Sequence, residues 1–158
     1  MWLFDRRGFL LTGLSLVGCG FEPVHRSASK SHVFSNEVFV QAPKNRAEFE
    51  LVRNLEIHFG PPTEKRYHLR YKLGVDEEIV VVSVAQEINR FNLVGLLEYS
   101  LVGADGVVLL SEAAKSFTGY SATGTTVATE RSKQDSYDRL MVILAKQVSN
   151  NLLILDRS

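Results

Sequence analysis

The sequence has little cysteine, no excess charge of either sign and few long apolar runs. Its single cysteine, Cys19, excludes an internal disulfide, so the fold must be stabilised by packing. The 18 basic and 18 acidic side chains cancel to a formal net charge of zero. We therefore expect no global field that attracts nucleic acid. No apolar run after residue 18 reaches the roughly 18 residues that a membrane-spanning helix needs. With 45% hydrophobic residues over the whole chain, there is enough apolar material for one core.

Signatures of catalysis and metal binding are also missing. The four histidines have no companion thiols and no ligand spacing, which argues against a zinc site; they are His25, His32, His58 and His68. The chain has no Gly-x-Ser-x-Gly motif, phosphate loop or dinucleotide fingerprint. Ser132, Asp135 and Asp138 could suggest a nucleophile with carboxylates, but helix capping explains the first two better. We expect a protein without catalytic residues, metal or cofactor.

The N-terminus has the features of an export signal. Arg6 and Arg7 precede an apolar run over residues 9–17, which is too short for a permanent transmembrane helix. The run ends in Leu-Val-Gly-Cys, a pattern similar to the lipobox of bacterial lipoproteins. The lipobox implies cleavage before Cys19 and diacylation of its thiol, so that the covalent lipid anchors the chain. The alternative is that Cys19 merely ends an N-terminal hydrophobic helix.

This interpretation divides the chain into three parts. Residues 1–18 would be the signal peptide, residues 19–35 an acylated N-terminus and tether, and residues 36–158 a single domain. The double arginine also fits a twin-arginine signal, so the export route stays open. Gly20, which is not aspartate, favours passage to the outer membrane in lipoproteins that resemble this one.

The first half of the domain predicts a strand and a helix. The short β-rich run 38–40 ends before Pro43. Asn45 and Glu48 have the spacing of a capping box. The apolar face of the helix that follows is predicted to contain Phe49, Val52, Leu55 and Phe59, widened by Leu51. Gly60-Pro61-Pro62 should end this helix.

Alternating residues then predict a meander of strands. Residues 67–73 alternate apolar with basic residues, followed by an expected acidic turn at 74–78 and a second β-branched strand over 79–84. Residues 88–102 read as a long strand. Asp105-Gly106 predicts a hairpin, and residues 107–120 a return strand.

The last element is an amphipathic helix. Ser132 and Asp135 are expected to cap it, and six apolar residues form its stripe: Tyr137, Leu140, Met141, Leu144, Val148 and Leu152. The order of elements predicts an α+β two-layer sandwich, with two helices packed on one face of a roughly four-stranded mixed sheet.

Three stretches, together with this order, resemble the LptE family, the lipopolysaccharide-assembly lipoproteins of the outer membrane. They are Cys19-Gly20-Phe21-Glu22-Pro23; 89–95 (NRFNLVG) with 98–101 (EYSL); and 120–124 (YSATG) with 127–129 (VAT) and 138–140 (DRL). The resemblance implies a small α/β domain within the lumen of the β-barrel LptD. There it would act as a plug and assembly partner and help deliver lipopolysaccharide to the outer leaflet.

Five basic residues are candidate contacts to lipopolysaccharide or to the barrel wall: Arg70, Lys72, Arg90, Arg131 and Lys133. The first three are expected on outward strand faces, and the last two before the final helix. In some relatives, basic residues near the second-strand hairpin and before the last helix contact lipopolysaccharide, although the turn expected at 74–78 is acidic here. Phosphate or carboxylate pairing would suit arginine. The simpler interpretation is an ordinary solvated charged face.

Three functions remain open at this point. The first is a non-enzymatic, lipid-anchored subunit of an LptD-like translocon, on the periplasmic side of the outer membrane or in the barrel lumen. The second is a stand-alone lipoprotein that carries a lipid or another envelope ligand in a groove between sheet and helices. The third, an envelope hydrolase, has no motif in its favour.

Overall fold

The computed structural model describes residues 34–82, 88–122 and 125–155. The expected signal peptide, Cys19 and nearly all of the tether lie outside these residues. The order of elements is β1 (Val38–Val40), α1 (Arg46–Phe59), β2 (Tyr67–Val82), β3 (Ile88–Gly103), β4 (Val108–Ser121) and α2 (Thr126–Leu155). None of the helices in this part of the chain has the length and apolar character needed to cross a membrane.

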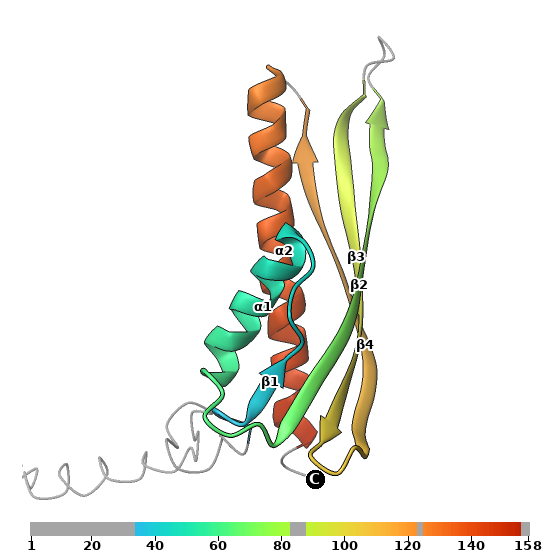
Figure 1. Cartoon of the computed structure of the whole chain (residues 1–158). Coiled ribbons are helices and arrows are strands. Elements are labelled where there is room, and N and C mark those ends of the chain that lie inside the picture. The colour runs from blue at the N-terminus through green and yellow to red at the C-terminus, as the bar shows by residue number, and fades with distance from the viewer. Residues whose placement is uncertain (1–33, 83–87, 123–124, 156–158) are drawn as a thin grey trace, which may run out of the picture. The chain divides into compact units, whose positions relative to one another are not determined.

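The four strands form one mixed sheet in the order β1-β2-β3-β4, with the helices together on one of its faces (Figure 1). β1 is parallel to β2, while β2, β3 and β4 are antiparallel neighbours. At the β3–β4 turn, Gly106 has a φ of 82°, a conformation that glycine adopts without a steric penalty. This arrangement confirms the predicted α+β sandwich and the hairpin at Asp105-Gly106.

The core is a layer of aliphatic side chains between the sheet and α2. Alternate residues of β3 point toward the helices, and Leu93, Leu97 and Leu101 are at most 1% exposed. Five residues of the predicted α2 stripe are completely buried against them: Leu140, Met141, Leu144, Val148 and Leu152. Gly95 lies among these leucines, and a Cβ built on it would lie 3.0 Å from Leu144 Cδ1. The absence of a side chain at this position lets α2 approach β3 closely.

Helix α1 begins as predicted but presents a slightly different face. The Asn45 side chain accepts a hydrogen bond from the Glu48 amide at 2.9 Å, as an N-cap does. The prediction that Phe49 faces the core is wrong, because this side chain is 55% exposed. Glu48 takes the inward position instead, and its carboxylate accepts a hydrogen bond from the Tyr71 hydroxyl at 3.3 Å. A polar pair thus occupies the start of the buried face of α1.

The acidic turn predicted at 74–78 does not exist. β2 runs unbroken through this segment, and Gly74 to Glu78 pair with Leu96 to Asn92 of β3 in continuous register. The segment can remain a strand because Asp76 and Glu78 are exposed, where a charge costs little, and Glu77 pairs with Lys133 of α2. The strand predicted over 79–84 is therefore the end of β2, and its last two residues lie outside the described part.

The start of the last helix was also predicted too late. α2 begins at Thr126, and the Thr125 side chain accepts a hydrogen bond from the Ala128 amide at 3.3 Å. Ser132 and Asp135 lie inside the helix, so they cannot cap it. Arg131 and Lys133 are likewise helical residues and do not precede α2.

Candidate functional site

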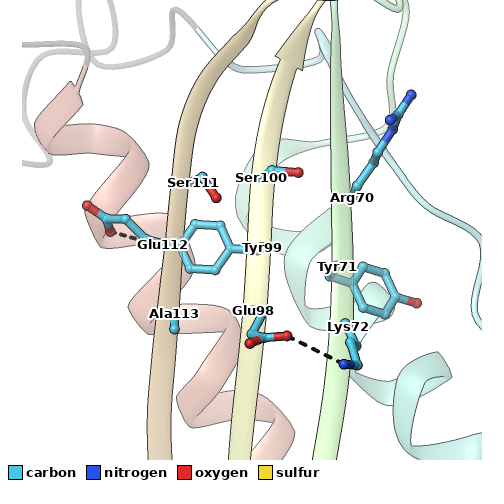
Figure 2. A pocket seen from close by; sticks show the side chains of 9 residues that line it. All are labelled: Arg70, Tyr71, Lys72, Glu98, Tyr99, Ser100, Ser111, Glu112 and Ala113. Carbon is cyan, nitrogen blue, oxygen red and sulfur yellow. Dashed lines mark hydrogen bonds and ion pairs between the residues drawn. The ribbon is translucent and has the colours of Figure 1, made fainter.

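The face of the sheet opposite the helices carries the candidate basic residues of β2. Register pairs Arg70 with Ser100 and Lys72 with Glu98, and β4 adds Ser111 beside Ser100. Figure 2 shows this cross-strand row, which lines an open depression of about 500 Å³. The site is therefore a shallow polar surface across three strands.

The charges of this depression partly cancel. Lys72 Nζ lies 3.8 Å from Glu98 Oε2, and both side chains are well exposed, so the attraction is weak. Glu112 is engaged with the helix layer, because its carboxylate accepts hydrogen bonds from the Tyr99 hydroxyl and the Asn151 amide. Burial, the main cause, raises the pKa of Tyr99 to about 12, which keeps its hydroxyl a donor.

Arg70 is the basic group of this surface that is available to a ligand. No hydrogen bond or ion pair joins its exposed side chain to another residue in the described part of the chain. Its planar guanidinium can bind a phosphate or carboxylate in a bidentate manner, and the hydroxyls of Ser100 and Ser111 can donate nearby. The arrangement suits anion contact and offers no activated nucleophile.

The five predicted basic residues do not form one site. Arg90 is exposed on β3, ten residues from Ser100, which corresponds to about 34 Å along the strand. Arg131 is exposed on α2, in the other layer. Only Arg70 and Lys72 are near neighbours, on successive outward positions of β2. The structure therefore brings together two of the five residues.

Lys133 has an internal partner. Its Nζ lies 2.5 Å from Glu77 Oε2, while the Tyr120 hydroxyl donates a short hydrogen bond to the other oxygen of the same carboxylate. The hydrogen bond from Lys133 holds the pKa of Glu77 below its ordinary value of 4.5, and the contact raises the pKa of Lys133. This triad connects α2, β2 and β4, so Lys133 has a structural role here.

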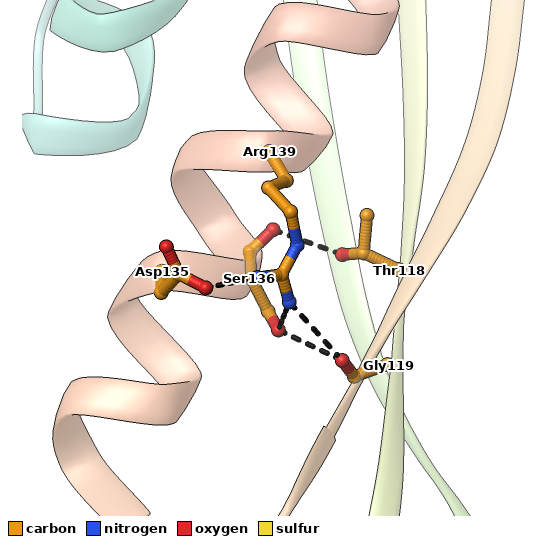
Figure 3. A network of polar contacts seen from close by, with 5 residues as sticks. All are labelled: Thr118, Gly119, Asp135, Ser136 and Arg139. Carbon is orange, nitrogen blue, oxygen red and sulfur yellow. Dashed lines mark hydrogen bonds and ion pairs between the residues drawn. The ribbon is translucent and has the colours of Figure 1, made fainter.

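A second polar network joins α2 to β4 (Figure 3). Ser136 is fully buried, and its hydroxyl donates to the Gly119 carbonyl at 2.9 Å, while Thr118 donates to the Ser136 carbonyl at 2.9 Å. Arg139 donates to both the Ser136 hydroxyl and the Gly119 carbonyl, and pairs with Asp135. Asp135 thus serves a helix-surface ion pair. Sequence reasoning missed Ser136, since a single serine on a helix carries no signal.

An apolar cluster on the open face was also missed. Phe117 is 66% exposed and lies opposite Val94 of β3, and the neighbouring Leu96 is 44% exposed. The alternation of β4 could have revealed it, because Phe117 falls on the side opposite Ala114 and Thr118. Exposed apolar groups that cluster on one face are typical of a contact surface.

The described histidines and acids show no metal-binding arrangement. His68 packs edge-on against the Phe39 ring, with 5.7 Å between centroids, and His58 lies in the last turn of α1. His25 and His32 lie outside the described residues. Among those that are described, no three His, Cys, Asp or Glu side chains gather as they would around a metal ion.

Comparison with known proteins gives structural matches only. No family model matches the chain, and no curated protein matches it by sequence. A crystal structure of a Caulobacter crescentus CB15 protein, described as a candidate lipoprotein, superposes with a TM-score of 0.64 at 19% identity, covering 78% of this chain and 92% of that one.

Two further solved structures share the architecture. An uncharacterized lipoprotein B from Nitrosomonas europaea gives a TM-score of 0.60 at 13% identity, covering 77% of this chain and 84% of that one. The rare lipoprotein B from Shewanella oneidensis gives a TM-score of 0.55 at 8% identity, covering 73% of this chain and 91% of that one. At these identities the matches establish that this chain has the fold of those three proteins.

Proposed function

We propose that the chain is a lipid-anchored, non-enzymatic lipoprotein of the outer membrane that works as the LptE-type partner of an LptD-like β-barrel. The observation that carries the proposal is a coincidence of two independent features. The N-terminus has a lipobox ending at Cys19, and the domain has the fold of solved proteins that are described as lipoproteins. In this role the domain plugs the barrel, assists its assembly and helps insert lipopolysaccharide into the outer leaflet.

The surface of the domain supports a role in contact with another large molecule. Its open face combines the exposed apolar side chains of Leu96 and Phe117 with the guanidinium of Arg70, which has no partner among the described residues. An apolar patch and a cation on the same face can bury against a barrel wall or against the acyl and phosphate groups of a lipopolysaccharide. Arg70 is therefore the basic residue that we assign to anion contact, with Lys72 beside it.

The alternative of a stand-alone lipid carrier has less support from the described residues. That function needs an apolar groove between sheet and helices. In the described domain this interlayer is filled by leucines of β3 and α2, among them Leu93, Leu97 and Leu140, none more than 1% exposed. A ligand would have to displace the core to enter there.

Affinity purification tests the proposal. The tagged full chain is captured from detergent-solubilised outer membrane, and an LptD-like barrel should be recovered at equal stoichiometry. Two variants are compared with wild type: Phe117→Glu, which charges the open face, and Ile57→Glu, which charges an exposed position on α1. Because an enclosing barrel covers both positions, each variant should lower the amount of barrel recovered. Recovery of the chain without any barrel would contradict the proposal and favour the stand-alone carrier.

A further inference from the structure

The sheet has one edge that is only partly covered. β1 pairs with β2 only from Tyr67 to Leu69, and the last hydrogen bond on this side runs from the Gln41 amide to the Leu69 carbonyl. β2 itself continues to Val82. In Figure 1, β1 lies beside only the beginning of β2, and no described strand follows the rest of that edge. More than half of a 16-residue strand is thus unpaired on one side.

The backbone groups that face this edge can be assigned. Tyr67 donates its amide toward β1, to the Glu37 carbonyl, and Leu69 accepts from β1. Because backbone groups alternate in direction along a strand, the odd residues of β2 face the β1 side and the even residues face β3. The amides and carbonyls of Leu73, Val75 and Glu77 therefore point to the open edge. None of them bonds another element within the described residues.

The opposite edge of the sheet is treated differently. Side chains of α2 occupy outward carbonyls of β4: Ser136 and Arg139 donate to Gly119, and Gln147 donates to Lys115 at 3.5 Å. Such contacts obstruct the pairing of another strand along that part of β4. The free part of β2 has no comparable cover from either helix in the described residues. Part of the β4 edge is therefore obstructed, whereas the β2 edge beyond Leu69 has no such contact among the described residues.

Charge selects the kind of strand that fits. Asp76 and Glu78 stand next to this edge on the open face, both exposed and without an ion-pair partner among the described residues. A second copy of this chain paired through the same edge would bring Arg70 and Lys72 beside these carboxylates only in one antiparallel register, the one centred on Gly74. A register that sets Asp76 against Glu78 is destabilising. A strand with basic side chains at alternate positions would place a cation beside each of these carboxylates.

We propose that the edge of β2 from Leu73 to Glu77 binds an extended polypeptide segment of a different protein by strand addition. The segment pairs with the backbone of Leu73, Val75 and Glu77, and its lysine or arginine residues at positions i and i+2 lie beside Asp76 and Glu78. The recognition needs only an extended basic segment, so it does not depend on the identity of the proposed barrel.

A peptide measurement on the full chain in detergent tests this directly. The probe is a fluorescent seven-residue peptide that alternates valine and lysine, and its counterpart has glutamate in place of lysine. Anisotropy should show binding of the lysine peptide at least tenfold tighter than that of the glutamate peptide. The double variant Asp76→Lys, Glu78→Lys should reverse this preference. An unchanged preference would contradict the proposal.

Val75→Pro separates strand addition from simple charge attraction. The Val75 amide faces the edge, so proline removes an edge donor without removing a bond to β3. Binding of the lysine peptide should weaken at least tenfold in Val75→Pro and less than twofold in Val75→Thr, which keeps the amide. Equal binding to wild type and Val75→Pro would overturn the proposal.

Hydrogen exchange gives a second measurement that needs no variant. In the free chain the amides of Val75 and Glu77 should exchange quickly, while those of Asp76 and Glu78, which face β3, should exchange slowly. Added lysine peptide should slow the exchange of the Val75 and Glu77 amides. Slow exchange at Val75 and Glu77 in the free, monomeric chain would mean that another segment of the same chain covers the edge. Dimerisation that Val75→Pro abolishes would identify a second copy. Either result would overturn the proposal.

Discussion

At the scale of single residues, burial decides the effect of truncating α2. Leu144 is fully buried, whereas Val142, two residues earlier in the same helix, is 46% exposed. Leu144→Ala should lower the free energy of unfolding by about 2–5 kcal/mol, since it removes apolar contacts and leaves a cavity. Val142→Ala should change it by less than about 0.5 kcal/mol. Urea titration of both variants measures the difference, and similar losses would mean that the packing of α2 is misassigned.

The two central glycines of the sheet give a second residue-scale prediction. A Cβ at Gly95 would meet Leu140 and Leu144 at 3.0–3.3 Å, whereas a Cβ at Gly74 has nothing nearer than the Leu96 carbonyl at 3.9 Å. Gly95→Val should therefore destabilise the domain by about 1–3 kcal/mol through overpacking. Gly74→Val should be tolerated, because valine suits an exposed strand position. The melting temperatures of the two variants provide the test.

At the scale of elements, the Glu77 triad should make the attachment of α2 to the sheet depend on pH. The pKa of Glu77 in the folded state lies below its ordinary value of 4.5, chiefly through the hydrogen bond from Lys133. Its contribution is full above pH 4.5 and is lost as the pH falls through the lowered value. The difference in unfolding free energy between wild type and Glu77→Gln should therefore shrink from pH 7 to pH 3.

The neighbouring carboxylate is the matched control. Glu78 is exposed and has no ion-pair partner among the described residues, so Glu78→Gln should follow wild type at both pH values.

On the alkaline side, the pKa of Lys133 is raised above 10.5, and burial raises the pKa of Tyr120 to about 12. The contribution of Lys133 persists to about pH 10.5 and is lost as the pH rises through its raised pKa. The contribution of Tyr120 to stability falls between pH 10 and 12, because tyrosine ionises near pH 10 in the unfolded chain and Tyr120 ionises only near pH 12 in the folded domain.

Periodicity predicted the elements better than their ends. Alternation identified β3 and the first half of β2, and the stripe from Leu140 to Leu152 identified α2, because both patterns reflect burial directly, whereas β4 followed from the hairpin signal at Asp105-Gly106. Local composition was misleading at Gly74–Glu78, where a run of turn-forming and acidic residues continues a strand that is held by its pairing with β3. Tertiary pairing overrode local preference there, and no local signal in the sequence reports it.

In the candidate site, too, the features that depend on local alternation were predicted, and those that depend on distant contacts were missed. The outward positions of Arg70 and Lys72 followed from strand alternation and are confirmed. Lys133 could not be assigned correctly, because its partner Glu77 lies 56 residues away and had been placed in a turn. The free edge of β2 was equally hidden, since it depends on where β1 stops pairing. Contacts between distant segments were the part that the sequence could not reveal.

At the scale of the whole domain, the structure leaves two outer faces for a partner, the open face of the sheet and the outer side of the helix layer. The interlayer between sheet and helices is closed by the leucine core, so binding must occur on the outside. Apolar side chains are exposed on both outer faces: Phe117 on the open face of the sheet and Ile57, 70% exposed, on α1. A partner that touches one side of the domain would cover only one of these residues, whereas a barrel that encloses it would cover both.

This difference yields a prediction for the molecule in its membrane. A photo-crosslinking amino acid placed at Phe117 or at Ile57 should, in either position, link the chain to the same LptD-like barrel in intact cells. Enclosure in the lumen requires both links, since the two positions lie on opposite layers of the sandwich. A link from Phe117 alone would indicate contact with one side of the domain and would contradict the plug. The control position is Leu97, which is buried in the core and should give no intermolecular product.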